Sequence, residues 1–183
     1  QPEGIVKVRE QARIQVEGEQ VGRVLYELLE PRRMSEGTLE SDLGLLSLPE
    51  PSPGDLFFDI EGDPFAFEDG IDFLFGVLEP GTLDPERKPV FHRFWSREDG
   101  CGAITPAGEK RAFEQVLDFF KGRLALDPNL HIYHYAPYEP AALGRLMGRY
   151  GAREDEVDRL LRAGVFVDLY RAVRQGLRVS VES

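Results

Sequence analysis

The chain has 183 residues, of which 42% are hydrophobic and 30% charged, values typical of a globular protein with one core. Its one cysteine, Cys101, cannot form an internal disulfide, and no apolar run has the length of a membrane span, so we expect a cytoplasmic protein without a membrane partner. Of its 33 acidic residues, 14 lie in 35–86, a stretch without Lys or Arg, so the net charge of −11 does not exclude a nucleic-acid ligand.

The first part of the chain is expected to be separate from the rest. Apolar residues spaced among charged ones predict a helix in 4–18, although a strand is not excluded, and the apolar run 24–29 favours a strand. Three prolines in 49–54 predict a stiff linker. We therefore expect 1–48 to be an arm or the tail of a preceding domain, and 55–183 to be a second domain. Upstream and downstream parts of the same polypeptide are expected partners.

One short apolar segment organises the interpretation of the second domain. The run 56–60, stopped by Gly62 and Pro64, predicts a strand that is buried on both faces. Because side chains alternate along a strand, Asp59 and Glu61 should share one face, about 7 Å apart. Two like charges there are costly unless one is protonated or a cation such as Mg²⁺ lies between them. The alternative is a strand-end pair that points into solvent.

The remaining patterns predict an α/β fold. Apolar runs predict further strands in 72–78, 89–95 and 130–135, and helical spacing predicts helices in 108–124, 138–150, 153–162 and 169–175. Three strands with short connections favour an antiparallel meander, and the helix that follows leads to a fourth strand parallel to the first. We therefore expect a mixed sheet with flanking helices, in which carboxylates at the ends of adjacent strands converge outside the sheet.

Three further residues follow the predicted strands. Glu139 lies in the first turn of a predicted helix. The helix dipole favours an acid at this position, so Glu139 need have no other role. Asp168 precedes another predicted helix, so an N-cap is its simplest interpretation. His134 ends the fourth strand and can be a buried, hydrogen-bonded residue. The chain has no phosphate-binding glycine loop, no zinc motif and no Ser/His/Asp arrangement.

Together these segments resemble the RNase H-like DEDD exonucleases, the DnaQ-like group. Their first motif, Asp-x-Glu on the first strand, matches Asp59-Ile60-Glu61, and their second, similar to His-Asn-x-x-Phe-Asp, matches residues 134–139. The strings Phe-Phe-Asp-Ile-Glu-Gly-Asp-Pro, Tyr-His-Tyr-Ala-Pro-Tyr-Glu-Pro and Val-Phe-Val-Asp-Leu-Tyr are similar to the YprB-type ribonuclease H-like domain of predicted RecB-family nucleases. The resemblance runs from about residue 54 to the end of the chain, and Glu139 stands where the wider family has Asp.

The resemblance implies a metal-dependent phosphodiester hydrolase, such as a 3′–5′ exonuclease, that acts on a single-stranded DNA or RNA end. It implies two Mg²⁺ or Mn²⁺ ions held by Asp59, Glu61 and Glu139 as the catalytic residues, with Asp59 bridging both ions. The supporting residues implied are Asp168, His134 and Tyr138. Phe65 is a candidate for stacking on an unpaired base, although packing is its simpler role.

The resemblance also implies a missing part. The fourth carboxylate and the general base of the family would lie after residue 183, so we expect the fold to be incomplete at its C-terminus. This piece alone should then be inactive, and apolar surface left exposed on the sheet should favour self-association.

Two other functions stay open at this point. The apolar run that ends in Asp59 also resembles the nucleophile strand of haloacid-dehalogenase-like phosphatases, but Glu61 stands where they have Asp and Asp63 where they have Thr. The later Lys and paired-Asp motif of those phosphatases is not clear in this chain. The third interpretation is a non-catalytic nucleic-acid-binding module that has kept the fold.

Overall fold

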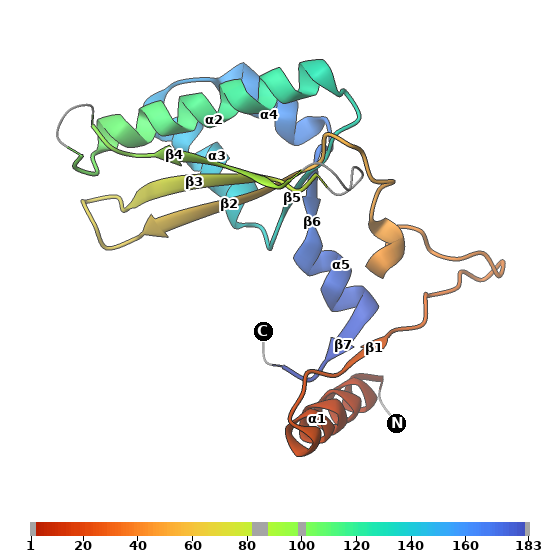
Figure 1. Ribbon diagram of the computed structural model, residues 1–183. Helices are drawn as coiled ribbons and strands as arrows, with labels where there is room; N and C mark the ends of the chain where they lie inside the picture. The colour runs from red at the N-terminus through yellow and green to blue at the C-terminus, as the bar shows by residue number, and fades with distance from the viewer. Residues whose placement is uncertain (1–2, 82–87, 99–101, 182–183) are drawn as a thin grey trace. The chain divides into compact units, whose positions relative to one another are not determined.

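The computed structural model describes residues 3–81, 88–98 and 102–181 (Figure 1). The contacts divide the chain into two compact units, one made of Gln1–Pro49 with Tyr170–Ser183 and the other of Glu50–Leu169. The expected domain limits stay a prediction. Among the described residues, no helix has both the length and the apolar character needed to cross a membrane.

The larger unit is built on a five-stranded mixed sheet. Its strands are β2 (Leu56–Asp63), β3 (Ile71–Glu79), β4 (Val90–Trp95), β5 (Ile132–His134) and β6 (Phe166–Asp168). Their order is β4-β3-β2-β5-β6, in which β2–β3 and β3–β4 are antiparallel while β2–β5 and β5–β6 are parallel. The predicted meander, the parallel fourth strand and the α/β fold class are therefore confirmed.

The described part of this unit contains helices α2 (Pro106–Leu126), α3 (Tyr138–Tyr150) and α4 (Glu154–Arg162). The hydroxyl of Thr105 accepts a hydrogen bond from the Gly108 N–H at 3.0 Å and so caps the start of α2. Helix α3 ends at Gly151, whose φ of 52° is a left-handed conformation that glycine adopts without strain. All three helices lie where apolar periodicity predicted them, with small differences at their ends.

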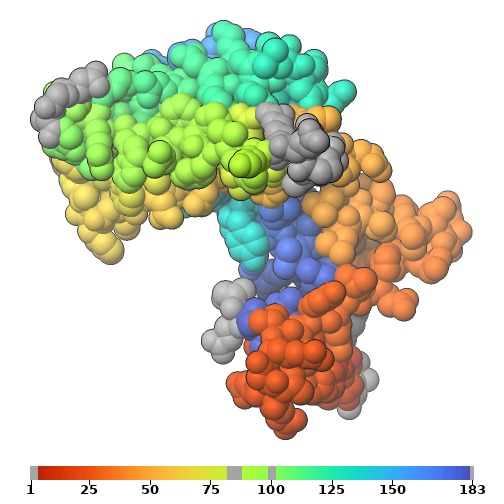
Figure 2. Space-filling model, viewed as in Figure 1, coloured from red at the N-terminus to blue at the C-terminus, as the bar shows by residue number. Residues whose placement is uncertain are grey.

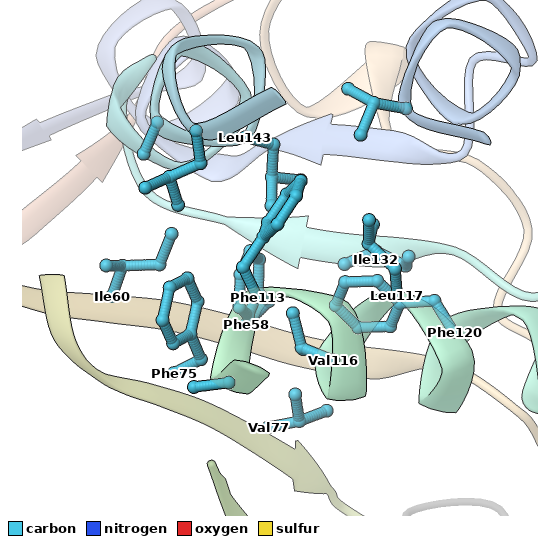
Figure 3. Close-up of a cluster of buried hydrophobic side chains, with 14 of the residues drawn as sticks. Phe58, Ile60, Phe75, Val77, Phe113, Val116, Leu117, Phe120, Ile132 and Leu143 are labelled. Carbon is cyan, nitrogen blue, oxygen red and sulfur yellow. The ribbon is translucent and has the colours of Figure 1, made fainter. Parts of the chain in front are cut away.

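The core lies between one face of the sheet and helices α2 and α3 (Figure 3). Phe58 on β2 meets Phe120 on α2 edge to face, with ring centroids 5.1 Å apart. Both side chains are almost completely buried, and burying a side chain of this size contributes about 2 kcal/mol. The largest fully buried apolar side chains of this unit come from the sheet, from helices α2 and α3 and from the turn before β5: Phe75, Leu56, Val77, Ile132, Phe113, Leu117, Phe120, Leu143, Leu146 and Leu130.

The prediction that the central strand is buried on both faces is wrong. Leu56, Phe58 and Ile60 are at most 6% exposed, whereas every second residue between them is exposed, including Phe57 at 39%. The physical reason is that α2 and α3 pack on the face that carries Phe58. The opposite face of β2, which carries Asp59, stays accessible. An aromatic run of this length is therefore compatible with a strand that is covered on one side.

The smaller unit contains α1 (Glu3–Val21), β1 (Tyr26–Leu28), a short 3₁₀ helix η1 (Gly44–Ser47) and β7 (Leu177–Val179), and it takes in all of α5 (Leu169–Gly176) except Leu169. Strands β1 and β7 pair antiparallel, and the carboxylate of Glu27 on β1 forms ion pairs with Arg13 of α1 and Arg178 of β7, at 2.5 and 2.8 Å. The predicted helix and strand of the N-terminal segment are confirmed.

Candidate functional site

Four of the predicted site residues lie toward the carboxyl ends of parallel strands. Strand β2 continues past the end of β5, and the part that continues carries Asp59 and Glu61. His134 is the last residue of β5 and is paired in the β5–β6 register with Asp168, the last residue of β6. Because parallel strands end at the same edge of a sheet, these side chains gather where α/β folds bind ligands.

Asp59 lies in a crowded negative environment. Its pKa is raised, first by partial burial of the carboxyl group and then by the charges of Glu61 and Glu139. Asp59 as a whole residue is exposed, and the partial burial applies to its carboxyl group. The charges of Glu61 on β2 and of Glu139 on α3 therefore both act on Asp59.

Glu139 differs from every other buried carboxylate of the described chain. It is 3% exposed, and its Oε2 atom has no hydrogen-bond partner among the described residues. The nearest cationic group is the Nδ1 atom of His134, at 3.5 Å. Four other carboxylates are at most 7% exposed, and each has a His or Arg nitrogen within 3.1 Å, in the pairs Asp55–His131, Asp72–Arg145, Glu79–Arg123 and Glu109–Arg149.

His134 is buried, as one interpretation of the sequence predicted. Its Nδ1 atom is 2.7 Å from the carbonyl oxygen of Ala136. Burial lowers the pKa of His134, but the Glu139 carboxylate, the Ala136 carbonyl and the charge of Asp168 outweigh burial, and the pKa is raised overall. The charges of Glu139 and Asp168 therefore both favour the protonated imidazole.

Asp168 stabilises the turn between β5 and α3. Its Oδ1 atom accepts a hydrogen bond from the Ala136 N–H at 3.0 Å. Ala136 has a φ of 68°, a left-handed conformation that is strained for a residue with a side chain. Asp168 thus fixes the turn that carries the chain from His134 to Glu139. The predicted N-cap role of Asp168 stays a prediction.

Tyr138 is 44% exposed and makes a specific polar contact. Its hydroxyl donates to Oδ1 of Asp72 at 2.9 Å, and Asp72 is 2% exposed. Asp72 is a residue that the sequence analysis missed. The available signal was weak: Tyr138 and Arg145, which both contact Asp72, are seven residues apart and so share a face of α3.

Phe65 is 93% exposed, the highest value among the large apolar side chains of the described residues. It lies in the connection between β2 and β3, where its N–H donates to Oδ1 of Asp63 at 2.8 Å. Figure 2 shows this connection as a yellow projection at the edge of the unit. Phe67 in the same connection is 53% exposed and has a φ of 60°. The structure therefore excludes packing as the role of Phe65 within this unit.

The residue types at the site suit a divalent cation, but the side chains that the structure describes are not grouped as a metal site. Carboxylate oxygens are the ligands that Mg²⁺ and Mn²⁺ prefer, and the Oε2 atom of Glu139 is buried without a partner in the described part of the chain. In that same part, no three His, Cys, Asp or Glu side chains are grouped so that they could hold a metal ion. Binding of one cation by Asp59, Glu61 and Glu139 together would therefore require these side chains to rearrange.

Comparison with known proteins identifies the family. The family model described as the RNase H superfamily matches residues 56–182, which is more than half of the chain. No match was found among curated proteins or among solved structures. The five-stranded mixed sheet with flanking helices is consistent with an RNase H-like fold. The chain belongs to the RNase H superfamily.

Proposed function

We propose that this protein is a divalent-metal-dependent phosphodiester hydrolase, a 3′–5′ exonuclease or a related nuclease of the DEDD type, that acts on DNA or RNA. Membership of the RNase H superfamily suggests a nuclease-like hydrolase in general. The observation that carries the finer proposal is the buried Oε2 atom of Glu139, which has no hydrogen-bond partner among the described residues and belongs to a carboxylate whose charge, with that of Glu61, helps to raise the pKa of the partly buried Asp59.

Asp59, Glu61 and Glu139 would hold Mg²⁺ or Mn²⁺. When bound, such ions supply a more acidic water and stabilise charge on the leaving oxygen. Asp59 and Glu61 project from the accessible face of β2, where a phosphate group of the substrate can approach them. In the absence of a cation, the raised pKa of Asp59 means that it keeps its proton to a higher pH than an ordinary aspartate, first because its carboxyl group is partly buried and then because Glu61 and Glu139 are also negative.

His134 and Asp168 have supporting roles in this proposal. The His134 ring and the turn at Ala136 lie between β5 and the first turn of α3, and Asp168 holds the Ala136 N–H. These contacts limit the positions that Glu139 can take. A ligand carboxylate whose orientation is fixed by its neighbours binds a metal more tightly than a mobile one.

Phe65 is proposed to stack on an unpaired base at the end of a single strand. Its ring is almost entirely exposed, and the connection that carries it directly follows the strand of Asp59 and Glu61. Stacking on an aromatic ring tolerates any base, since every base has a flat apolar face. This role suits an enzyme that removes nucleotides without reading their sequence.

The experiment is a cleavage assay of the intact protein on labelled single-stranded DNA and RNA, with Mn²⁺ or with EDTA. We expect Mn²⁺-dependent cleavage that Asp59→Asn abolishes. The matched control is Asp118→Asn, which changes a half-exposed aspartate on α2 that pairs with Arg153. Cleavage in EDTA, or an equal loss in both variants, would contradict the proposal. Mn²⁺ binding without cleavage would favour the non-catalytic module, and the superfamily match lends no support to the phosphatase alternative.

A further inference from the structure

Helix α3 is attached at its beginning to a buried carboxylate of β3. The Tyr138 hydroxyl donates to Oδ1 of Asp72 at 2.9 Å, and a guanidinium nitrogen of Arg145 lies 2.6 Å from Oδ2 of the same carboxylate. Both oxygens of Asp72 are therefore occupied by groups of α3. The Arg145 guanidinium also lies 5.8 Å from the centre of the Tyr138 ring, so the three side chains form one packed set.

The other end of α3 carries a second set of the same composition. The Tyr150 hydroxyl lies 2.5 Å from Oε2 of Glu109, and a nitrogen of Arg149 lies 2.9 Å from the same atom. Glu109 is 0% exposed. The two sets are joined, because the Asp72 N–H donates to Oε1 of Glu109. Each end of α3 is thus held by one tyrosine, one arginine and one buried carboxylate.

Only the first set lies beside the candidate site. The β2–β3 pairing is irregular between Glu61 and Gly62, and Gly62 is paired with Asp72. A Cβ atom at Gly62 would lie 2.7 Å from Oδ1 of Asp72 and 3.0 Å from the Tyr138 hydroxyl. The contact between these two side chains therefore lies against the backbone that follows Glu61. Tyr138 in turn directly precedes Glu139 in the chain.

We propose that Asp72, Tyr138 and Arg145 are positioning residues that hold Glu139 of α3 opposite Asp59 and Glu61 of β2. The inference rests on the proposed function. A buried carboxylate needs partners, and a phenol on a short, stiff side chain defines the separation between strand and helix more closely than a long flexible donor does. Tyr150 is twelve residues from Tyr138, about 18 Å along the helix, so the second set stabilises the fold without orienting Glu139.

The test compares Tyr138→Phe with Tyr150→Phe in the 183-residue chain. Each variant loses one hydroxyl that contacts a buried, arginine-paired carboxylate, so both should lower the melting temperature in EDTA by similar amounts. Mn²⁺ affinity, measured from the electron paramagnetic resonance signal of free Mn²⁺, should fall about 10-fold in Tyr138→Phe and stay unchanged in Tyr150→Phe. Equal Mn²⁺ affinity in the two variants would overturn the inference.

A third variant repeats the test without removing either side chain. Gly62→Ala places a methyl group against Asp72 and Tyr138, and it should weaken Mn²⁺ binding as Tyr138→Phe does. Unchanged Mn²⁺ affinity in Gly62→Ala, with a normal melting temperature, would also overturn the inference. Asp59→Asn distinguishes failure of the proposed function from failure of the positioning role alone. If it binds Mn²⁺ as the wild type does, the proposed function has failed and the positioning role fails with it.

Discussion

The Oε2 atom of Glu139 lies 3.5 Å from the Nδ1 atom of His134, and both side chains are only 4% exposed. The imidazole nitrogen is nearer to the Ala136 carbonyl, at 2.7 Å, so the contact with Glu139 is the weaker of the two. A carboxylate oxygen that is buried without a strong partner costs free energy, typically about 1–3 kcal/mol. The fold tolerates that cost at the position where a ligand would supply the missing partner.

Asp59→Asn should not destabilise the metal-free protein. The raised pKa of Asp59 means that its ionised form is less favourable in the folded state than in the unfolded chain. Replacing Asp59 with the neutral Asn side chain, which has the same shape, removes this unfavourable charge. The melting temperature in EDTA at pH 7 should therefore be equal to or higher than that of the wild type. Asp118→Asn, which breaks an exposed ion pair, should lower stability by about 0.5 kcal/mol or less. A clear fall in the melting temperature of Asp59→Asn would argue against a crowded anionic site.

The stability difference between wild type and Asp59→Asn should depend on pH. A group whose pKa is raised on folding contributes stability that is present below its unfolded pKa and is lost as the pH rises through its folded pKa. For Asp59 this loss begins near the ordinary value of 3.8. The free energy of unfolding, measured with urea in EDTA, should therefore increase for Asp59→Asn relative to the wild type as the pH rises above about 4. A difference that is constant from pH 3 to pH 8 would contradict the raised pKa.

Glu139→Gln should separate metal binding from folding. Because the Oε2 atom accepts no hydrogen bond from a described residue, replacing the carboxylate with an amide of nearly the same size should change the melting temperature little. Mn²⁺ affinity should fall by about 10-fold or more, since a direct ligand contributes at least as much as an outer-shell partner. A variant with normal Mn²⁺ affinity would remove Glu139 from the site.

Phe65→Ala should affect substrate binding without affecting stability. The ring is 93% exposed, so its loss should change the free energy of unfolding by less than about 0.5 kcal/mol. If the ring stacks on a terminal base, KM for a single-stranded end should rise by about 5-fold or more, with kcat nearly unchanged. The control is Leu126→Ala, which removes an 80% exposed side chain at the end of α2, next to the turn that leads toward β5. Equal kinetics in the two variants would leave Phe65 without a role in binding.

Much of the larger unit follows from local pattern. The alternation in 56–61 placed Asp59 and Glu61 on one face of a strand, and helical spacing located α2, α3 and α4. The same run could not show that helices cover only one face of β2, because the number of covering layers is decided by elements distant in sequence. For that reason Phe57 was expected to be buried and is half exposed.

The contacts that support the site could not be predicted from the sequence. Asp72 and Glu109 were ordinary acids in a strand and a helix until the fold brought the ends of α3 against them. Asp168 was expected before a helix, and its partner, the Ala136 N–H, belongs to a turn 32 residues earlier. Such long-range pairs depend on the register between strands, which composition and periodicity do not reveal.

The most direct test of the central claim is a crystal structure of the chain grown with Mn²⁺ and recorded at a wavelength where manganese scatters anomalously. The account predicts an anomalous peak about 2.2 Å from carboxylate oxygens of Asp59, Glu61 and Glu139, with the Asp59 and Glu61 side chains turned toward α3. A peak elsewhere on the surface, or none at this site while Glu139 stays buried against His134, would contradict it.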